Sequence, residues 1–108
     1  MASLASKRCL PCEGGTPPLS AAQAKTLLAE LQDWKIENGK ISRTIVFKNF
    51  KEALALVNKI GELAEKEGHH PDIFLFSWNK VTVTLWTHAI KGLSENDFIL
   101  AAKIDKII

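Results

Sequence analysis

The sequence predicts a single α+β domain, in which a four-stranded antiparallel sheet carries helices on one face. Two pairs of β-prone segments alternate with three segments of helical pattern, in the order helix, two strands, helix, two strands, helix. Each strand pair contains a short turn signal, which favours hairpins and hence antiparallel pairing. At 108 residues the chain is long enough for one hydrophobic core.

Residues 1–18 are expected to form a flexible N-terminal arm, and residues 19–108 the folded domain. Gly14-Gly15 and Pro17-Pro18 interrupt any regular pattern in the arm. Ser20 then suits the N-cap of a helix over residues 21–31.

The first hairpin is predicted from residues 34–37 and 40–47. Both segments are rich in β-prone residues, and Asn38-Gly39 between them is the strongest short-range hairpin signal.

Two further helices have clear start signals. Asn49 precedes a helix over residues 50–66 whose apolar residues recur at helical spacing, and Gly68 is suited to end it. Ser94 precedes the last helix, with acidic residues in the first turn where they complement the helix dipole.

The second hairpin is expected from residues 73–78 and 80–88, with a turn at Asn79-Lys80. The second of these strands alternates with period two. The alternation assigns Val81, Val83 and Leu85 to the core face and Thr82, Thr84, Trp86 and His88 to the opposite face.

Composition excludes several classes of protein. The net charge of +2 is small and the lysines are spread along the chain, so a nucleic-acid-binding face is not indicated. No apolar run approaches the ~18 residues that a membrane span requires. Without the apolar core of a secretory signal near the N-terminus, a cytoplasmic location is expected.

The two cysteines, Cys9 and Cys12, form a C-x-x-C pair within the arm. A redox pair would normally lie between a strand and a helix, and a zinc site would need further ligands. Two thiols without a chemical role are the favoured interpretation; a redox pair and half of a shared metal site remain alternatives.

The three histidines of the chain fall within twenty positions, at His69, His70 and His88. Histidine titrates near neutral pH and serves both as general acid and as general base. A metal site is the alternative, but adjacent residues in extended chain point to opposite sides, which disfavours a shared ion for His69 and His70. Each ring could also be an ordinary half-buried or surface histidine.

Two carboxylates lie near these histidines in the sequence. Glu65 precedes His69 by four residues, and Asp97 follows His88. A carboxylate bonded to an imidazole fixes its tautomer and orientation. Each could instead be an ordinary helix charge.

Several of these segments together resemble the pterin-4a-carbinolamine dehydratase family. The resemblance covers residues 19–108 and is carried by Glu65 through Pro71, Trp78-Asn79-Lys80-Val81, Thr87-His88 and Gly92 through Asp97. It implies dehydration of 4a-hydroxytetrahydropterin to quinonoid dihydropterin, without metal or organic cofactor, in support of tetrahydrobiopterin recycling after aromatic amino acid hydroxylases.

The resemblance also implies roles for individual residues. His69 and His88 would be the acid–base pair, and His70 would bind and polarise the pterin. Glu65 and Asp97 would orient the imidazoles. Trp78 and Trp86 would have core or pterin-stacking roles.

Members of the family form homodimers or homotetramers, and some animal members act as dimerisation cofactors of a homeodomain transcription factor. A non-catalytic coactivator, which would be compatible with presence in the nucleus, is therefore the alternative function. Neither membrane association nor direct nucleic-acid binding is expected.

Overall fold

The computed structural model describes residues 3–9 and 17–108. It contains three helices and a four-stranded antiparallel sheet in the order α-β-β-α-β-β-α, so the predicted α+β class is confirmed. The helices are α1 (Ala21–Leu28), α2 (Phe50–Glu67) and α3 (Glu95–Ile107). The strands are β1 (Lys35–Glu37), β2 (Lys40–Val46), β3 (Asp72–Phe76) and β4 (Lys80–Leu85).

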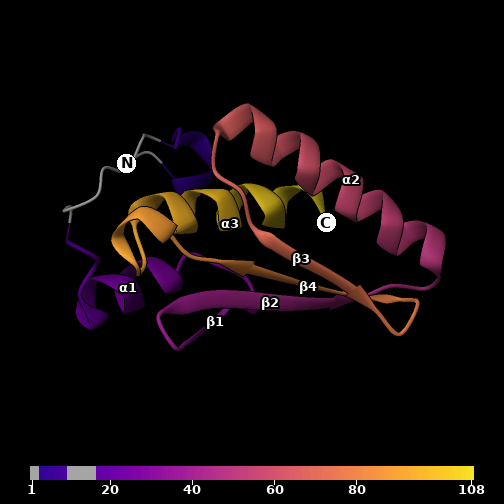
Figure 1. The fold of residues 1–108 in the computed structure, drawn as a ribbon, viewed down its shortest axis with the longest axis horizontal. Helices are drawn as coiled ribbons and strands as arrows, with labels where there is room; N and C mark the ends of the chain where they lie inside the picture. Colours follow the sequence, from indigo (N-terminus) through magenta and orange to yellow (C-terminus); the bar gives the residue numbers. More distant parts are fainter. Residues whose placement is uncertain (1–2, 10–16) are drawn as a thin grey trace.

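The strands lie in the order β1-β2-β4-β3, and α2 and α3 lie along one face of the sheet (Figure 1). The first hairpin turns at Asn38-Gly39, where both residues have positive φ, as a tight two-residue hairpin turn requires. The predicted strand parity is confirmed in β4, where Val81, Val83 and Leu85 are fully buried.

The second hairpin turns earlier than the sequence predicts. Phe76 pairs with Lys80, so the turn comprises residues 77–79, and its left-handed residues are Ser77 and Trp78. Backbone hydrogen bonding explains the shift, because Asn79 accepts the Phe47 N–H at 2.7 Å and is thereby tied to the end of β2.

Two elements, α1 and β4, end about three residues earlier than predicted. Helix α1 ends at Leu28 rather than residue 31, and the Gln32 N–H donates to the Asp105 carboxylate, which draws the following chain onto α3. Strand β4 ends at Leu85, and a 3-10 helix over His88–Ile90 follows. His88 therefore starts this short helix instead of ending the strand.

Residues 3–9, which the sequence assigned to a flexible arm, pack against the domain. A 3-10 helix over Leu4–Ser6 contacts α3, and only 2% of Leu4 is exposed. The remainder of the predicted arm up to residue 16 lies outside the described residues, Cys12 included.

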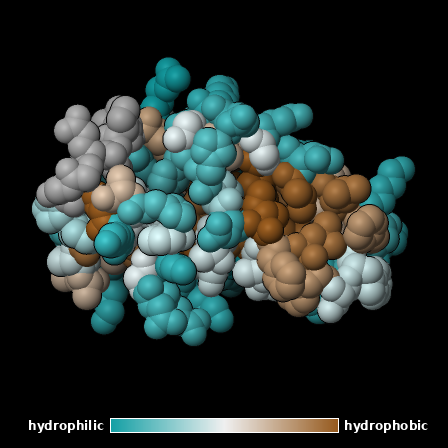
Figure 2. Space-filling view, in the orientation of Figure 1, coloured by the Kyte–Doolittle hydropathy of each residue, from teal (hydrophilic) through white to brown (hydrophobic). Residues whose placement is uncertain are grey.

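Apolar side chains are unevenly distributed over the surface. On the face seen in Figure 2 they gather on the right, over β3 and the N-terminal part of α2. The left half, which holds α1, is mainly polar. The exposed large apolar residues include Val46, Phe50, Leu54, Phe74 and Trp78. Among the described residues, no helix combines the length and apolarity needed to cross a membrane.

Candidate active site

The site begins where α2 ends. Gly68 adopts the left-handed conformation at φ 67°, and its N–H bonds the Ala64 carbonyl. The helix therefore stops at a defined point, and the following His69 turns towards the first turn of α3.

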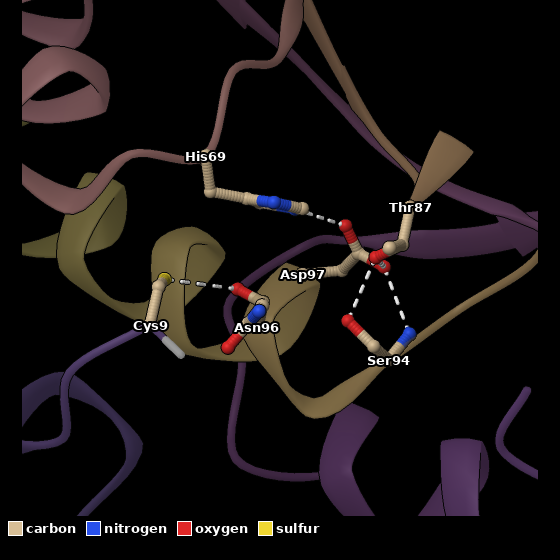
Figure 3. Close-up of polar contacts among 6 residues, drawn as sticks. All are labelled: Cys9, His69, Thr87, Ser94, Asn96 and Asp97. Atoms are coloured by element: carbon tan, nitrogen blue, oxygen red, sulfur yellow. Dashed lines mark hydrogen bonds and ion pairs between the residues drawn. The ribbon is translucent and has the colours of Figure 1, made fainter. Parts of the chain in front are cut away.

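His69 forms a buried pair with Asp97. The His69 Nε2 atom lies 2.6 Å from Asp97 Oδ1, and the two side chains are 13% and 0% exposed. Figure 3 shows the imidazole edge of His69 directed at the Asp97 carboxylate. The sequence order had suggested Asp97 as the neighbour of His88, but the fold brings it to His69.

The second oxygen of Asp97 is held by two donors. Both the Ser94 N–H and the Thr87 hydroxyl donate to Asp97 Oδ2 at 2.9 Å (Figure 3). Because the Thr87 hydrogen is used there, the Ser94 hydroxyl donates to Thr87 Oγ1 across their 2.7 Å contact. Asp97 therefore accepts the backbone N–H of the N-cap residue Ser94 and contacts His69 at the same time.

This hydrogen bonding assigns the His69 tautomer. An ionised carboxylate only accepts hydrogen bonds, and Asp97 already accepts two at Oδ2. The ring then donates its Nε2–H to Oδ1, and Nδ1 is left as the ring nitrogen that can accept a proton.

His70 forms a similar contact with Glu65, but at the surface. The His70 Nε2 atom lies 2.6 Å from Glu65 Oε2, with 62% of the histidine side chain and 78% of the glutamate side chain exposed. Both predicted orienting carboxylates therefore contact a histidine, although Glu65 contacts His70 rather than its nearer candidate His69.

His88 is exposed and packs on Trp86, with ring centroids 3.8 Å apart and planes inclined by 36°. Lys40 Nζ lies 4.8 Å from the centroid of the same indole ring, within the range of a cation–π contact. Because Thr87 bonds Asp97, the chain carries His88 to the same end of the sheet as His69.

Trp78 is not brought to this cluster within the chain. It lies in the β3–β4 turn with 60% of its surface exposed, separated from the histidines by the length of β3. At 3.3 Å per residue, that separation is roughly 20 Å.

Thr87, Ser94 and Lys40 were not singled out as site residues from the sequence. The spacing of Ser94 and Asp97 predicted the start of a helix. It did not indicate that Asp97 would also contact a histidine. The Thr87 and Lys40 contacts depend on strand register.

A cavity of about 510 Å³ lies elsewhere, lined by Leu4, Arg43 and Asp105 among others, and by no histidine. Its carboxylate is already bonded by Arg43 and by the Trp34 indole. Proton-transfer groups gather at His69 instead, so the histidine cluster is the better candidate active site. In residues 3–9 and 17–108, no group of three or more His, Cys, Asp or Glu side chains is placed to hold one metal ion.

Cys9 has the properties of a structural thiol. Burial, and after it the nearby Glu67 carboxylate, raise the pKa of the Cys9 thiol to about 12. A reactive cysteine has a lowered pKa, so the redox interpretation of this residue is not supported.

The protein is therefore an α+β domain with two histidine–carboxylate pairs, side chains that are suited to proton transfer. Comparison with known proteins gives the class: the sequence model of the family described as pterin 4 alpha carbinolamine dehydratase matches residues 17–107.

Individual relatives agree. A candidate pterin-4-alpha-carbinolamine dehydratase of Alkaliphilus metalliredigens is 56% identical over 98% of this chain and 96% of its own. A protein of the same description from Rickettsia canadensis is 50% identical over the whole of both chains. The chain therefore belongs to the pterin 4 alpha carbinolamine dehydratase family, whose members are hydro-lyases, and the predicted family and enzyme class are confirmed.

Solved structures support the fold. The crystal structure of a transcriptional coactivator/pterin dehydratase from Brucella melitensis is similar with a TM-score of 0.79 and 33% identity, over 83% of this chain and 97% of that one. A pterin dehydratase-like protein described as a RuBisCO assembly factor in the alpha-carboxysome shares the fold alone, with a TM-score of 0.57 at 22% identity, over 71% of this chain and 88% of that one.

Proposed function

We propose that this protein dehydrates 4a-hydroxytetrahydropterin to quinonoid dihydropterin by histidine acid–base catalysis, in support of tetrahydrobiopterin recycling. The observation that carries the proposal is the buried His69–Asp97 pair, with its 2.6 Å contact and its doubly bonded second carboxylate oxygen. A histidine held this way has a fixed tautomer and a free ring nitrogen.

The reaction needs two proton transfers. One group removes the proton from the ring nitrogen adjacent to the carbinolamine carbon, while another protonates the departing hydroxyl. The carbon–oxygen bond breaks, water leaves, and the nitrogen lone pair forms the carbon–nitrogen double bond. No electron acceptor is required.

We assign the base to His69 and the acid to His88. Asp97 stabilises a positive charge on His69 once its Nδ1 has taken the proton, as a buried carboxylate does for a catalytic imidazole. His88 is exposed and lies on Trp86, where it can exchange protons with water between turnovers. His70 binds and polarises the pterin, Glu65 orients His70, and Trp86 and Trp78 offer aromatic faces for stacking.

Location and assembly form part of the same proposal. We place the enzyme in the cytoplasm, and the family resemblance supports assembly as a homodimer or homotetramer. Trp78, which is distant from the histidines of its own chain, would contact pterin only if assembly brought it to the site of another subunit.

A stopped-flow assay with freshly generated carbinolamine tests the reaction. Exchange of His69 or of His88 for alanine should slow dehydration by about 10²–10⁴-fold, the usual contribution of a positioned acid or base. Lys59→Ala, on the exposed face of α2, is the matched control and should retain the parent rate.

Parent rates in both histidine variants would refute the assignment. Loss of activity on treatment with a chelator would favour the metal alternative. Absence of turnover, together with a stoichiometric transcription-factor partner, would favour the coactivator alternative.

A further inference from the structure

Residues 3–9 touch both backbone segments that carry the buried pair. The Cys9 N–H donates to Glu67 Oε1 at 3.0 Å, and Glu67 is the last residue of α2. The Cys9 thiol donates to the Asn96 carbonyl at 3.6 Å, directly before Asp97 in α3 (Figure 3). One residue of the N-terminal segment therefore joins the end of α2 to the start of α3.

This junction is anchored by a buried charge. Only 5% of the Glu67 side chain is exposed, and its partner across 3.9 Å is Lys103 of α3. Lys103 in turn donates to the Ala5 carbonyl at 2.8 Å. The N-terminal segment therefore adds one hydrogen bond to each member of this ion pair, from the Cys9 N–H to Glu67 and from Lys103 to the Ala5 carbonyl, and buried charges need such additional partners.

The positions of these contacts matter because His69 and Asp97 are 28 residues apart in sequence. Glu67 precedes His69 by two residues and Asn96 precedes Asp97 by one. A shift of α2 relative to α3 would lengthen the His69–Asp97 contact directly. A displacement of about 1 Å in a catalytic group can lower a rate by about 10²-fold.

We propose that residues 3–9 form a strap that holds the end of α2 against the start of α3 and so sets the His69–Asp97 geometry, with Cys9 as a positioning residue. The catalytic part of this inference rests on the proposed dehydratase function, whereas the geometric part does not. Leu4, buried against the core, keeps the strap in place.

Two strap variants test the inference in a Cys12→Ser background. Leu4→Ser undocks the strap by placing a hydroxyl in an apolar site, and should lower kcat by about tenfold or more with KM nearly unchanged. Cys9→Ala removes the thiol donor and should lower kcat by about two- to fivefold, whereas Cys9→Ser keeps a donor and should restore the parent value.

Two readouts report on geometry without substrate. The ¹⁵N chemical shifts of the His69 ring should move in Leu4→Ser and in Cys9→Ala, and return in Cys9→Ser. Docking itself is measured by alkylation of Cys9 with iodoacetamide, which should be slow in the parent because little thiolate is present, and faster by about tenfold or more after Leu4→Ser.

Leu27→Ala is the control for stability, because Leu27 packs on the same core from α1 and is distant in sequence from both Glu67 and Asn96. Unchanged kcat and unchanged His69 shifts in Leu4→Ser, despite faster alkylation, would overturn the strap. An equal loss of kcat in Leu27→Ala would also overturn it. If the parent has no dehydratase activity, the ring shifts still decide the geometric inference.

Discussion

Two histidine–carboxylate pairs lie next to each other in this protein and have the same contact distance, 2.6 Å. His69 and Asp97 are almost fully removed from water, whereas His70 and Glu65 are mostly exposed. Exposed ion pairs contribute little because water and salt screen them, but a buried pair cannot lose one partner without leaving an uncompensated polar group. Burial therefore determines how much each pair contributes to the stability of the protein.

The largest expected effect comes from removing the carboxylate charge of the buried pair. In Asp97→Asn, the amide oxygen should stay with the Ser94 N–H and the Thr87 hydroxyl, so the amide NH₂ turns to His69. That donor forces His69 Nε2 to accept and places the ring proton on Nδ1, the wrong tautomer for a base. We expect kcat to fall by about 10²-fold or more.

Glu65→Gln is the matched variant in the exposed pair, and it should lower kcat by less than about tenfold. Urea denaturation should show a loss of about 1.5–3 kcal/mol for the buried pair, the usual contribution of a hydrogen bond to a charged group, and at most about 1 kcal/mol for the exposed one. Equal losses in the two variants would remove the distinction between the pairs.

A smaller effect is expected from the groups that hold Asp97. Thr87→Val keeps the side-chain shape but removes the hydroxyl donor to Asp97 Oδ2 and leaves the Ser94 hydroxyl without its acceptor. We expect a loss of about 1–3 kcal/mol in urea denaturation and a fall in kcat of about tenfold, with recovery in Thr87→Ser.

Thr44→Val is the control for this change. Thr44 shares a 2.7 Å hydroxyl contact with Thr82, but on the exposed face of the sheet. Its replacement should alter stability by no more than about 0.5 kcal/mol. A Thr87→Val protein with parent stability and parent kcat would show that Ser94 alone is sufficient to hold Asp97.

The sequence predicted the fold well because its signals are local. Asn38-Gly39, Gly68 and Ser94 each determine the backbone within a few residues, and all three have the predicted conformation. The β3–β4 turn was misplaced because Asn79 is held by Phe47, a residue 32 positions away that no local pattern reveals.

The candidate site was predicted only as a set of residues. The histidines and carboxylates were identified from the sequence, but their pairing depends on how α2 meets α3. Proximity in sequence suggested Asp97 for His88 and Glu65 for His69, and the fold places each with a different histidine. The packing of residues 3–9 was missed because Leu4 is a single apolar residue in a short segment without periodicity.

The smallest expected effect is the response of each pair's coupling energy to salt. A double-mutant cycle of Glu65→Gln and His70→Gln, at a pH low enough to protonate imidazole, should give a coupling energy of about 0.2–1 kcal/mol in dilute buffer. At 1 M salt the screening length falls to about 3 Å, so this coupling should become close to zero. The equivalent cycle with Asp97→Asn and His69→Gln should keep most of its coupling, because salt ions do not reach a carboxylate with 0% exposure. If salt abolished both couplings alike, water would have access to Asp97, and the buried pair could not fix the orientation of His69.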